Sequence, residues 1–337
     1  MLSNGSDVID VYYQKIGIRT VNATQTSFLI NGQKFYFKGF GKHEDSAVRG
    51  RGLDLALIIK DFNLMKWMGA NSFRTSHYPY SEELMDQADQ QGIVVVDECP
   101  AVGLHSFGPQ LYEQHSFTIQ ELIQRDKNRP SVVMWSIANE PHSQDPKSDE
   151  YFKKLVLLTK GLDENRPLSA ALNQDVKMDH LAKYLDVIMI NRYFGWYQDT
   201  GASDLIKKQL SFDLKQWFKA HNKPIMMSEY GADSVSGVHS DPSYVFTEDY
   251  QCDLMIENFA AFDEVRMEGF FIGEMIWNFA DFMTDQTVGR VFGNRKGIFT
   301  RDRQPKAAAR LLRCRYIQMG NSTQIRLNDN GFMYCLK

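Results

Sequence analysis

The sequence predicts an α/β protein built as a closed (β/α)8 TIM barrel. Short apolar runs rich in Val, Ile and Met alternate with longer segments of helical periodicity. We count eight such alternations, the number that closes a barrel of this type. Two of the apolar runs lead into a glutamate, Glu140 and Glu229, followed by turn-forming residues. Both carboxylates are therefore expected at the mouth of the barrel rather than in its packed interior.

The first residues differ from the rest of the chain. Residues 8–13 and 17–21 are short and β-rich, and residues 26–30 lead into Asn31-Gly32, a strong hairpin signal. We expect residues 1–25 to be the tail of an upstream β domain. The barrel is then expected over residues 26–318, with a C-terminal tail over residues 319–337.

The first half of the barrel follows in order. Its first helix places Ile58, Phe62 and Met65 on one face, and its second has Ser81 at the cap and Gly92 at the end. The strand at 93–97 is almost wholly Val and Ile, as expected when both faces are buried. In this half we expect strands at 35–40, 70–75, 93–97 and 132–138, and helices at 53–68, after 81 and near 117–127.

The second half repeats the pattern. A helix over 149–160 stops at Gly161, and a final helix begins after Pro305, a good first-turn residue. The expected strands are 168–172, 187–191, 224–228 and 270–277, and the other helices are 205–221 and 247–267.

An open doubly wound sheet is the rival architecture, but it favours a glycine-rich phosphate turn after the first strand. Gly39-Phe40-Gly41 lacks the third glycine of that turn, and residues 293–297 lack the spacing of a P-loop. Nucleotide binding is therefore unsupported.

Composition excludes several classes of partner. A formal net charge of −4 and a pI near 6.1 give no basic footprint for nucleic acid or an anionic membrane. No run of about 18 apolar residues suggests a membrane span, and the first residues lack the pattern of a signal peptide. The eight histidines form no ligand motif, so neither a metal nor another cofactor is expected. Asn-x-Ser/Thr sequons at Asn4, Asn22 and Asn321 matter only in the secretory route.

Paired carboxylates at one barrel mouth suit a particular chemistry. One carboxyl can protonate a leaving oxygen while the other attacks an acetal carbon. Glu140 and Glu229 are therefore the candidate catalytic residues.

Several longer motifs make a resemblance specific. The chain resembles the catalytic barrel of glycoside hydrolase family two, most closely its β-glucuronidase group of the animal lysosomal type. The similarity covers most of residues 26–316. The segments that carry it are Lys-His-Glu-Asp at 42–45, Phe-Arg-Thr-Ser-His-Tyr-Pro-Tyr at 73–80, Gly-Ile-Val-Val-Val-Asp-Glu-Cys-Pro at 92–100, Trp-Ser-Ile-Ala-Asn-Glu-Pro at 135–141, Ser-Glu-Tyr-Gly at 228–231, Trp-Asn-Phe-Ala-Asp-Phe at 277–282 and Gly-Asn-Arg-Lys-Gly-Ile-Phe-Thr-Arg at 293–301.

The resemblance implies a retaining double displacement. Glu140 would be the general acid and later the base, which requires a raised pKa. Glu229 would be the nucleophile, with the two carboxyl groups about 5 Å apart. Asn139 would bind the sugar 2-hydroxyl, and the hydroxyl of Tyr193 would hold Glu229 ionised and oriented.

The resemblance also implies the substrate. A glucuronide carries a carboxylate, and the Asn-x-Lys of Asn294 and Lys296 supplies a hydrogen-bond donor and a cation for it, with Arg290 placed to assist. We therefore expect removal of terminal β-D-glucuronic acid from glucuronides or glycosaminoglycan ends. His77, Tyr197 and Trp277 are expected to contact the sugar, while Asp45 and His43 contact the ring or orient the rim.

Departures from the family leave alternatives open. Gly41 stands where the family usually has Asn, and the sugar-binding and immunoglobulin-like β domains that precede the barrel are reduced to a remnant strand or two. A catalytically silent barrel that binds glycan or pairs with full-length subunits is one alternative, and another hexosidase of the same family is a second. By resemblance, the full-length form would be a lysosomal or secreted homotetramer.

Overall fold

The computed structural model describes residues 2–13, 16–287, 290 and 292–320. Eight strands close into a barrel in the order β10-β11-β12-β13-β6-β7-β8-β9, and every neighbouring pair is parallel. The predicted TIM barrel is confirmed. Its strands are β6 (Phe37–Gly41), β7 (Ser72–Arg74), β8 (Val94–Glu98), β9 (Val132–Asn139), β10 (Leu168–Leu172), β11 (Ile188–Asn191), β12 (Ile225–Glu229) and β13 (Phe271–Ile276).

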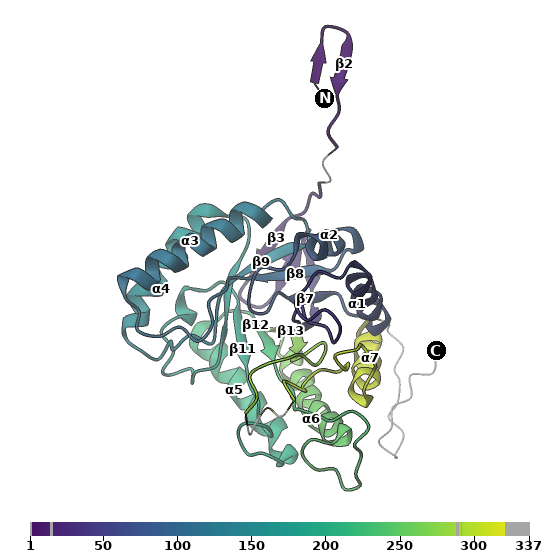
Figure 1. Ribbon diagram of the computed structural model, residues 1–337. Coiled ribbons are helices and arrows are strands. Elements are labelled where there is room, and N and C mark those ends of the chain that lie inside the picture. Colours follow the sequence, from purple (N-terminus) through teal and green to yellow (C-terminus); the bar gives the residue numbers. More distant parts are fainter. Residues whose placement is uncertain (1, 14–15, 288–289, 291, 321–337) are drawn as a thin grey trace.

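Helices surround the barrel (Figure 1). They are α1 (Leu55–Met68), α2 (Glu82–Gln91), α3 (Pro109–Asp126), α4 (Lys147–Leu162), α5 (Ile206–His221), α6 (Glu248–Met267) and α7 (Ala307–Gly320). The Asp54 side chain caps α1 and the Thr247 side chain caps α6, each by accepting from a backbone N–H. Because helices cover the outside and side chains fill the inside, every residue of β9 is buried.

Two expected helix boundaries and one crossover differ from the structure. Helix α3 begins at Pro109, which supplies a preset first-turn conformation, rather than near residue 117. Gly161 lies inside α4 instead of ending it. Between β10 and β11 the described chain forms only the short 3-10 helix η1 (Ala182–Tyr184), which begins where Asp179 Oδ1 accepts from two backbone N–H groups. The fifth crossover is therefore shorter than the repeating pattern implied.

Two small sheets precede the barrel. Strands β1 (Leu2–Asn4) and β2 (Asp7–Asp10) pair into a hairpin that projects away from the barrel (Figure 1). Strands β3 (Val21–Ala23), β4 (Phe28–Ile30) and β5 (Gln33–Phe35) form an antiparallel sheet, so pairing runs across the expected boundary at residue 25.

The three-stranded sheet packs against one end of the barrel. Phe28 of β4 and Phe37 of β6 meet edge to face at 4.9 Å, and both are fully buried. They belong to a core cluster that also includes inward-facing residues of the barrel such as Val133, Met189 and Met226. Because Phe37 begins β6, this sheet covers the amino-terminal end of the barrel and leaves the opposite mouth open for chemistry.

Candidate active site

Glu140 and Glu229 both lie at the carboxyl-terminal mouth of the barrel. Glu229 is the last residue of β12, and Glu140 directly follows β9. Glu140 has a φ of +45°, in the left-handed region that glycine and asparagine favour, and its N–H donates to Ala171 O at 2.8 Å. The backbone of β10 thus fixes the turn that carries the Glu140 side chain.

The carboxyl group of Glu140 accepts one hydrogen bond at each oxygen. Asn191 Nδ2 donates to Oε1 at 2.8 Å, and Asn173 Nδ2 donates to Oε2 at 3.1 Å. Burial raises the pKa of Glu140, and the negative charge of Glu229 raises it further, against the opposing hydrogen bond from Asn191. A carboxyl in this position is suited to holding a proton.

Glu229 has the opposite environment. Tyr193 donates its hydroxyl to Oε2 at 2.6 Å, and Arg74 donates Nη2 to Oε1. Burial and the charge of Glu229 raise the pKa of Tyr193 well above its ordinary value, so the phenol stays protonated and continues to donate. Glu229 thus has a hydrogen-bond donor at each oxygen and a cation at one of them. The two glutamates are therefore differentiated by their surroundings.

Arg74, at the end of β7, is a site residue that the sequence reasoning missed. Its side chain is fully buried, and its Nη1 donates to Glu98 Oε2 at 2.6 Å while Nη2 reaches Glu229. Burial alone would raise the pKa of Glu98, but the charge of Arg74 and the hydrogen bonds from His77 and Ser136 hold it at about 2. The available signal was an arginine and a glutamate at the ends of two successive apolar strands.

Two asparagines connect the glutamates. Asn139 Oδ1 accepts from Arg74 Nη1 and from Asn191 Nδ2, each at 3.3 Å. Ser228 Oγ donates to Asn191 Oδ1 at 2.7 Å and orients that amide. Because the carbonyl of Asn139 is occupied, its NH2 group is the part of the side chain suited to donate to a sugar hydroxyl.

The Asn-x-Lys segment, Asn294 to Lys296, lies near Tyr193, on the Glu229 side of the mouth. Asn294 Oδ1 accepts from the Lys296 N–H at 3.1 Å, and Lys296 Nζ donates to Asp233 Oδ2 at 3.1 Å. The ammonium also lies 4.9 Å from the ring centroid of Tyr197 and 5.9 Å from that of Tyr193. Lys296 is thus a buried cation next to the tyrosine that binds Glu229, and Asp233, its partner, was not predicted.

Arg290 and Tyr197 form the outer part of this region. Arg290 Nη2 donates to the Tyr197 hydroxyl at 3.3 Å, and 56% of Tyr197 is exposed. Tyr197 in turn packs edge to face on Tyr193 at 5.0 Å. An accessible cation and hydroxyl therefore lie above the buried ammonium of Lys296.

His77 and Trp277 form the facing wall. Their rings stack at 5.1 Å, and His77 Nδ1 bonds Glu98 Oε1 at 2.8 Å. Gly41 makes room for the indole, because a Cβ at residue 41 would overlap Trp277 Cε3 and lie 2.7 Å from Cζ3. Residue 41, where the resembling family usually has Asn, is therefore a glycine against which the Trp277 indole packs directly.

Asp45 and His43, the two residues expected at the rim, occupy structural positions. Asp45 forms a paired contact with Arg301, at 2.7 Å for each oxygen, and also accepts from the Met283 N–H. His43 Nδ1 lies 3.2 Å from the Tyr78 hydroxyl. Of the two readings, orientation of the rim fits Asp45 better than a sugar contact.

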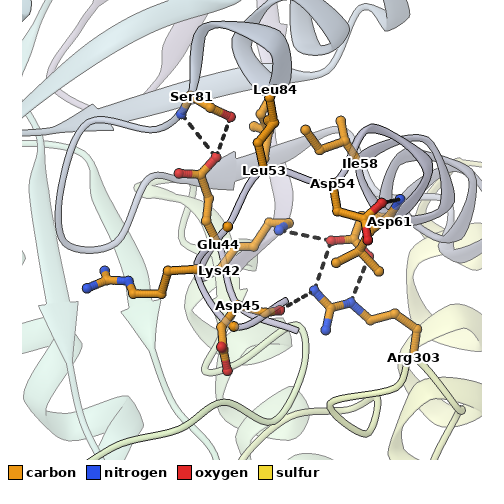
Figure 2. Close-up of a pocket in the computed structure, with 14 residues that line it drawn as sticks. Lys42, Glu44, Asp45, Leu53, Asp54, Ile58, Asp61, Ser81, Leu84 and Arg303 are labelled. Carbon is orange, nitrogen blue, oxygen red and sulfur yellow. Dashed lines mark hydrogen bonds and ion pairs between the residues drawn. The ribbon is translucent and has the colours of Figure 1, made fainter. Parts of the chain in front are cut away.

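A pocket lies under the loop between β6 and α1, and its lining contains neither Glu140 nor Glu229 (Figure 2). Lys42 Nζ pairs with Asp61 at 2.9 Å, and Arg303 pairs with the same carboxylate at 2.8 Å. Glu44 accepts from the Ser81 hydroxyl at 2.6 Å, so Ser81 occupies the cap position of α2 without capping it. These internal pairs fix the loop that follows Gly41 and carries His43.

Two other features, a metal site and a membrane-spanning helix, are absent from the described residues. No group of three or more His, Cys, Asp or Glu side chains there is arranged to hold a metal ion. Within the same part of the chain, no helix combines the length and apolarity needed to cross a membrane.

Comparisons with known proteins agree with this geometry. The family model described as "Glycosyl hydrolases family 2, TIM barrel domain" matches residues 21–321. The chain is 51% identical over 319 residues to the β-glucuronidase of Mus musculus and 50% identical over 320 residues to that of Homo sapiens, covering 94% of this chain and 49% of each relative. It thus spans about half the length of the curated relatives it matches.

Solved structures give the same picture. The β-glucuronidase of an uncultured Clostridium species superposes with a TM-score of 0.88 at 51% identity, covering 90% of this chain and 54% of that one. The Bifidobacterium dentium β-glucuronidase, solved with coumarin-3-O-glucuronide, superposes with a TM-score of 0.88 at 46% identity, covering 93% of this chain and 51% of that one.

Proposed function

Because this chain belongs to glycosyl hydrolase family 2, matching its TIM barrel domain over residues 21–321, we propose that it is a retaining β-glucuronidase. It would remove terminal β-D-glucuronic acid by double displacement. One observation carries the proposal: Glu229 is held by Arg74 and Tyr193, while burial and the charge of Glu229 raise the pKa of Glu140. That asymmetry assigns the nucleophile and the acid.

In the first displacement Glu229 attacks the anomeric carbon as a carboxylate. Tyr193 and Arg74 orient its two oxygens, each by one hydrogen bond. Glu140 gives its proton to the glycosidic oxygen, which leaves as an alcohol with the electron pair of the broken bond. The result is a glycosyl ester on Glu229 and an ionised Glu140.

In the second displacement Glu140 acts as a base. It takes a proton from water, whose oxygen attacks the anomeric carbon and releases Glu229 as a carboxylate. Two inversions give net retention. The NH2 group of Asn139 would bind the sugar 2-hydroxyl, a contact that strengthens in the transition state. Trp277 and His77 would line the opposite face of the ring.

Selection of glucuronides is assigned to the region around Lys296. Its ammonium and the donors of Asn294, Arg290 and Tyr197 would receive the sugar carboxylate. The position of Lys296 beside Tyr193, at 5.9 Å, supports this assignment, because it places the cation next to the residue that orients the nucleophile. A neutral hexoside would leave the cation without a second anionic partner.

The similarity to animal β-glucuronidases also supports a proposal for the biological setting. The relatives of this chain include the β-glucuronidases of Mus musculus and Homo sapiens, which supports a substrate of the glucuronide class, either a small glucuronide or a glycosaminoglycan end. We also propose a lysosomal or secreted location, and a homotetramer for the full-length form. Sedimentation of the full-length protein would test the tetramer.

The experiment is an assay of the purified chain on a chromogenic β-glucuronide and on the matching β-galactoside, with Glu229→Gln as the control. We expect glucuronide turnover that is lost in Glu229→Gln. Turnover of the galactoside alone would contradict the substrate assignment and favour another hexosidase of the family. A folded monodisperse chain without turnover would favour a silent, glycan-binding barrel.

A further inference from the structure

Besides Asn191, a second amide donates to Glu140, and it has no role in the proposed double displacement. Asn173 directly follows β10 and donates Nδ2 to Glu140 Oε2 at 3.1 Å. The other carboxyl oxygen, Oε1, accepts from Asn191, which is only 2% exposed. Asn173 itself is exposed. Oε2 is therefore the outward oxygen of the carboxyl, on the side from which a leaving group meets solvent.

The orientation of Asn173 is fixed by its neighbours. Gln174 Nε2 donates to Asn173 Oδ1 at 2.8 Å, which occupies the carbonyl and leaves the NH2 group facing Glu140. The Gln174 carbonyl accepts from Arg192 Nη2 at 2.7 Å. Arg192 is 9% exposed and is anchored by Asp213 at 2.8 Å. Arg192, held by the half-buried Asp213, therefore supports the half-buried Gln174 and, through it, the exposed amide of Asn173 next to Glu140.

We propose that Asn173, oriented by Gln174, is a positioning residue for Glu140 and holds its outward oxygen toward the leaving group. The inference rests on the proposed glycosidase function. As the proton passes from Oε2 to the glycosidic oxygen, negative charge develops on the Glu140 carboxyl. The hydrogen bond from Asn173 then becomes charge-assisted and stronger. It stabilises the transition state more than the ground state, which is the requirement for an effect on rate.

The first test compares leaving groups. Phenyl β-glucuronide needs protonation of its oxygen, whereas a dinitrophenyl β-glucuronide departs readily without it. For Asn173→Ala we expect kcat/KM on the phenyl substrate to fall about tenfold, with little change on the dinitrophenyl substrate. Rates are taken on the plateau below the alkaline limb, where Glu140 is protonated in both proteins. Asn63→Ala, which removes an exposed amide from α1, serves as the matched control.

The second test reads the hydrogen bond directly and does not depend on turnover. Carbon-13 labelling of glutamate side chains follows the Glu140 carboxyl through a pH titration by NMR, with Glu140→Gln identifying the signal. Loss of a donor to the carboxylate disfavours the charged form, so the midpoint should move to higher pH in Asn173→Ala. Asn173→Asp keeps the shape but removes the donor and adds a like charge, so it should move the midpoint further.

The outcomes separate the two claims. Equal loss on both substrates would assign Asn173 a purely structural role and overturn the inference. An unchanged midpoint would overturn it as well. A wild-type chain that is folded but turns over neither substrate would contradict the proposed function, and the titration would still decide whether Asn173 holds the carboxyl of Glu140.

Discussion

Asp233 accepts a hydrogen bond from the ammonium of Lys296 at 3.1 Å, and both residues are buried, with Asp233 2% exposed and Lys296 1% exposed. The second oxygen of Asp233 accepts from the Arg295 N–H at 2.9 Å. One carboxylate thus fixes both the backbone and the cation of the Asn-x-Lys loop. In a glucuronide complex Lys296 would be shared between Asp233 and the sugar carboxylate.

This arrangement predicts that Asp233→Asn weakens the binding of the glucuronide substrate. The amide keeps an acceptor for the Arg295 N–H but turns a donor toward the buried ammonium, so Lys296 loses its anchor. We expect kcat/KM for a β-glucuronide to fall about tenfold or more, chiefly through KM. Steady-state kinetics check this result.

Asp186→Asn is the matched control, because Asp186 pairs with Lys160 just before β11, at the end of the strand away from the mouth. A variant at 233 with unchanged KM would show that the pair does not position Lys296.

The environment of Glu140 predicts a gain in stability when its charge is removed. Because the folded-state pKa of Glu140 lies above the unfolded value, the stability cost of the carboxylate develops as the pH rises from the unfolded pKa through the folded pKa and is complete above it. Glu140→Gln should therefore raise the Tm at neutral and alkaline pH. Near pH 4 and below, where both states are protonated, the variant and the wild type should agree. Calorimetry of both proteins across pH measures this difference. A lower Tm for Glu140→Gln than for the wild type at neutral pH would contradict the prediction.

For the ion pair of Arg74 and Glu98, removal of the carboxylate charge should lower stability instead of raising it. The pKa of Glu98 is held at about 2, so its contribution to stability is present above the unfolded value and is lost as the pH falls from about 4 toward 2. Glu98→Gln leaves a buried guanidinium with reduced compensation and should destabilise by about 3 kcal/mol at neutral pH. Urea unfolding at neutral pH and near pH 3 tests both parts. A difference that does not shrink in acid would contradict the assignment.

The close packing of Trp277 on Gly41 predicts a cost for any side chain at that position. Gly41→Ala would push the indole away from His77 or strain β6, costing about 1–3 kcal/mol. It should also raise KM for the glucuronide. Thermal unfolding and kinetics measure the two effects.

Gly161→Ala is the control for that change, because Gly161 lies inside α4 with no heavy atom within 4 Å of a Cβ. It should stabilise the chain by about 0.5–1 kcal/mol. If both alanines behave alike, the indole contact is not what constrains Gly41.

The barrel could be predicted from the sequence because each parallel strand is buried on both faces and therefore reads as an apolar run. Strand β9 and strand β12 are examples, and every residue in each is buried. The crossover after β10 could not be predicted, since its short 3-10 helix begins where the Asp179 side chain accepts from two backbone N–H groups and has no helical periodicity to signal it. Helix α3 was predicted too short because its first turns lack a continuous apolar stripe.

The predicted catalytic pair and Tyr193 come together at one mouth, but the buried charges around them escaped prediction. Arg74 meets Glu229 across 155 residues of sequence, and Lys296 meets Asp233 across 63. No local pattern signals such a pairing, because an isolated charged residue in a sequence is usually solvated. Only the folded barrel shows that these buried charges are paired at its mouth.

The most direct test of the central claim is to trap the covalent intermediate on Glu229. A fluorine at sugar carbon 2 slows both steps, and a fluoride leaving group restores the first, so a difluorinated β-glucuronyl substrate should accumulate as an ester. Intact-protein mass spectrometry should then show one added fluoroglucuronyl group, with the label on the peptide that contains Glu229 and none in Glu229→Gln. A label on another residue, or an unlabelled chain that still hydrolyses β-glucuronides to the inverted sugar, would contradict the account.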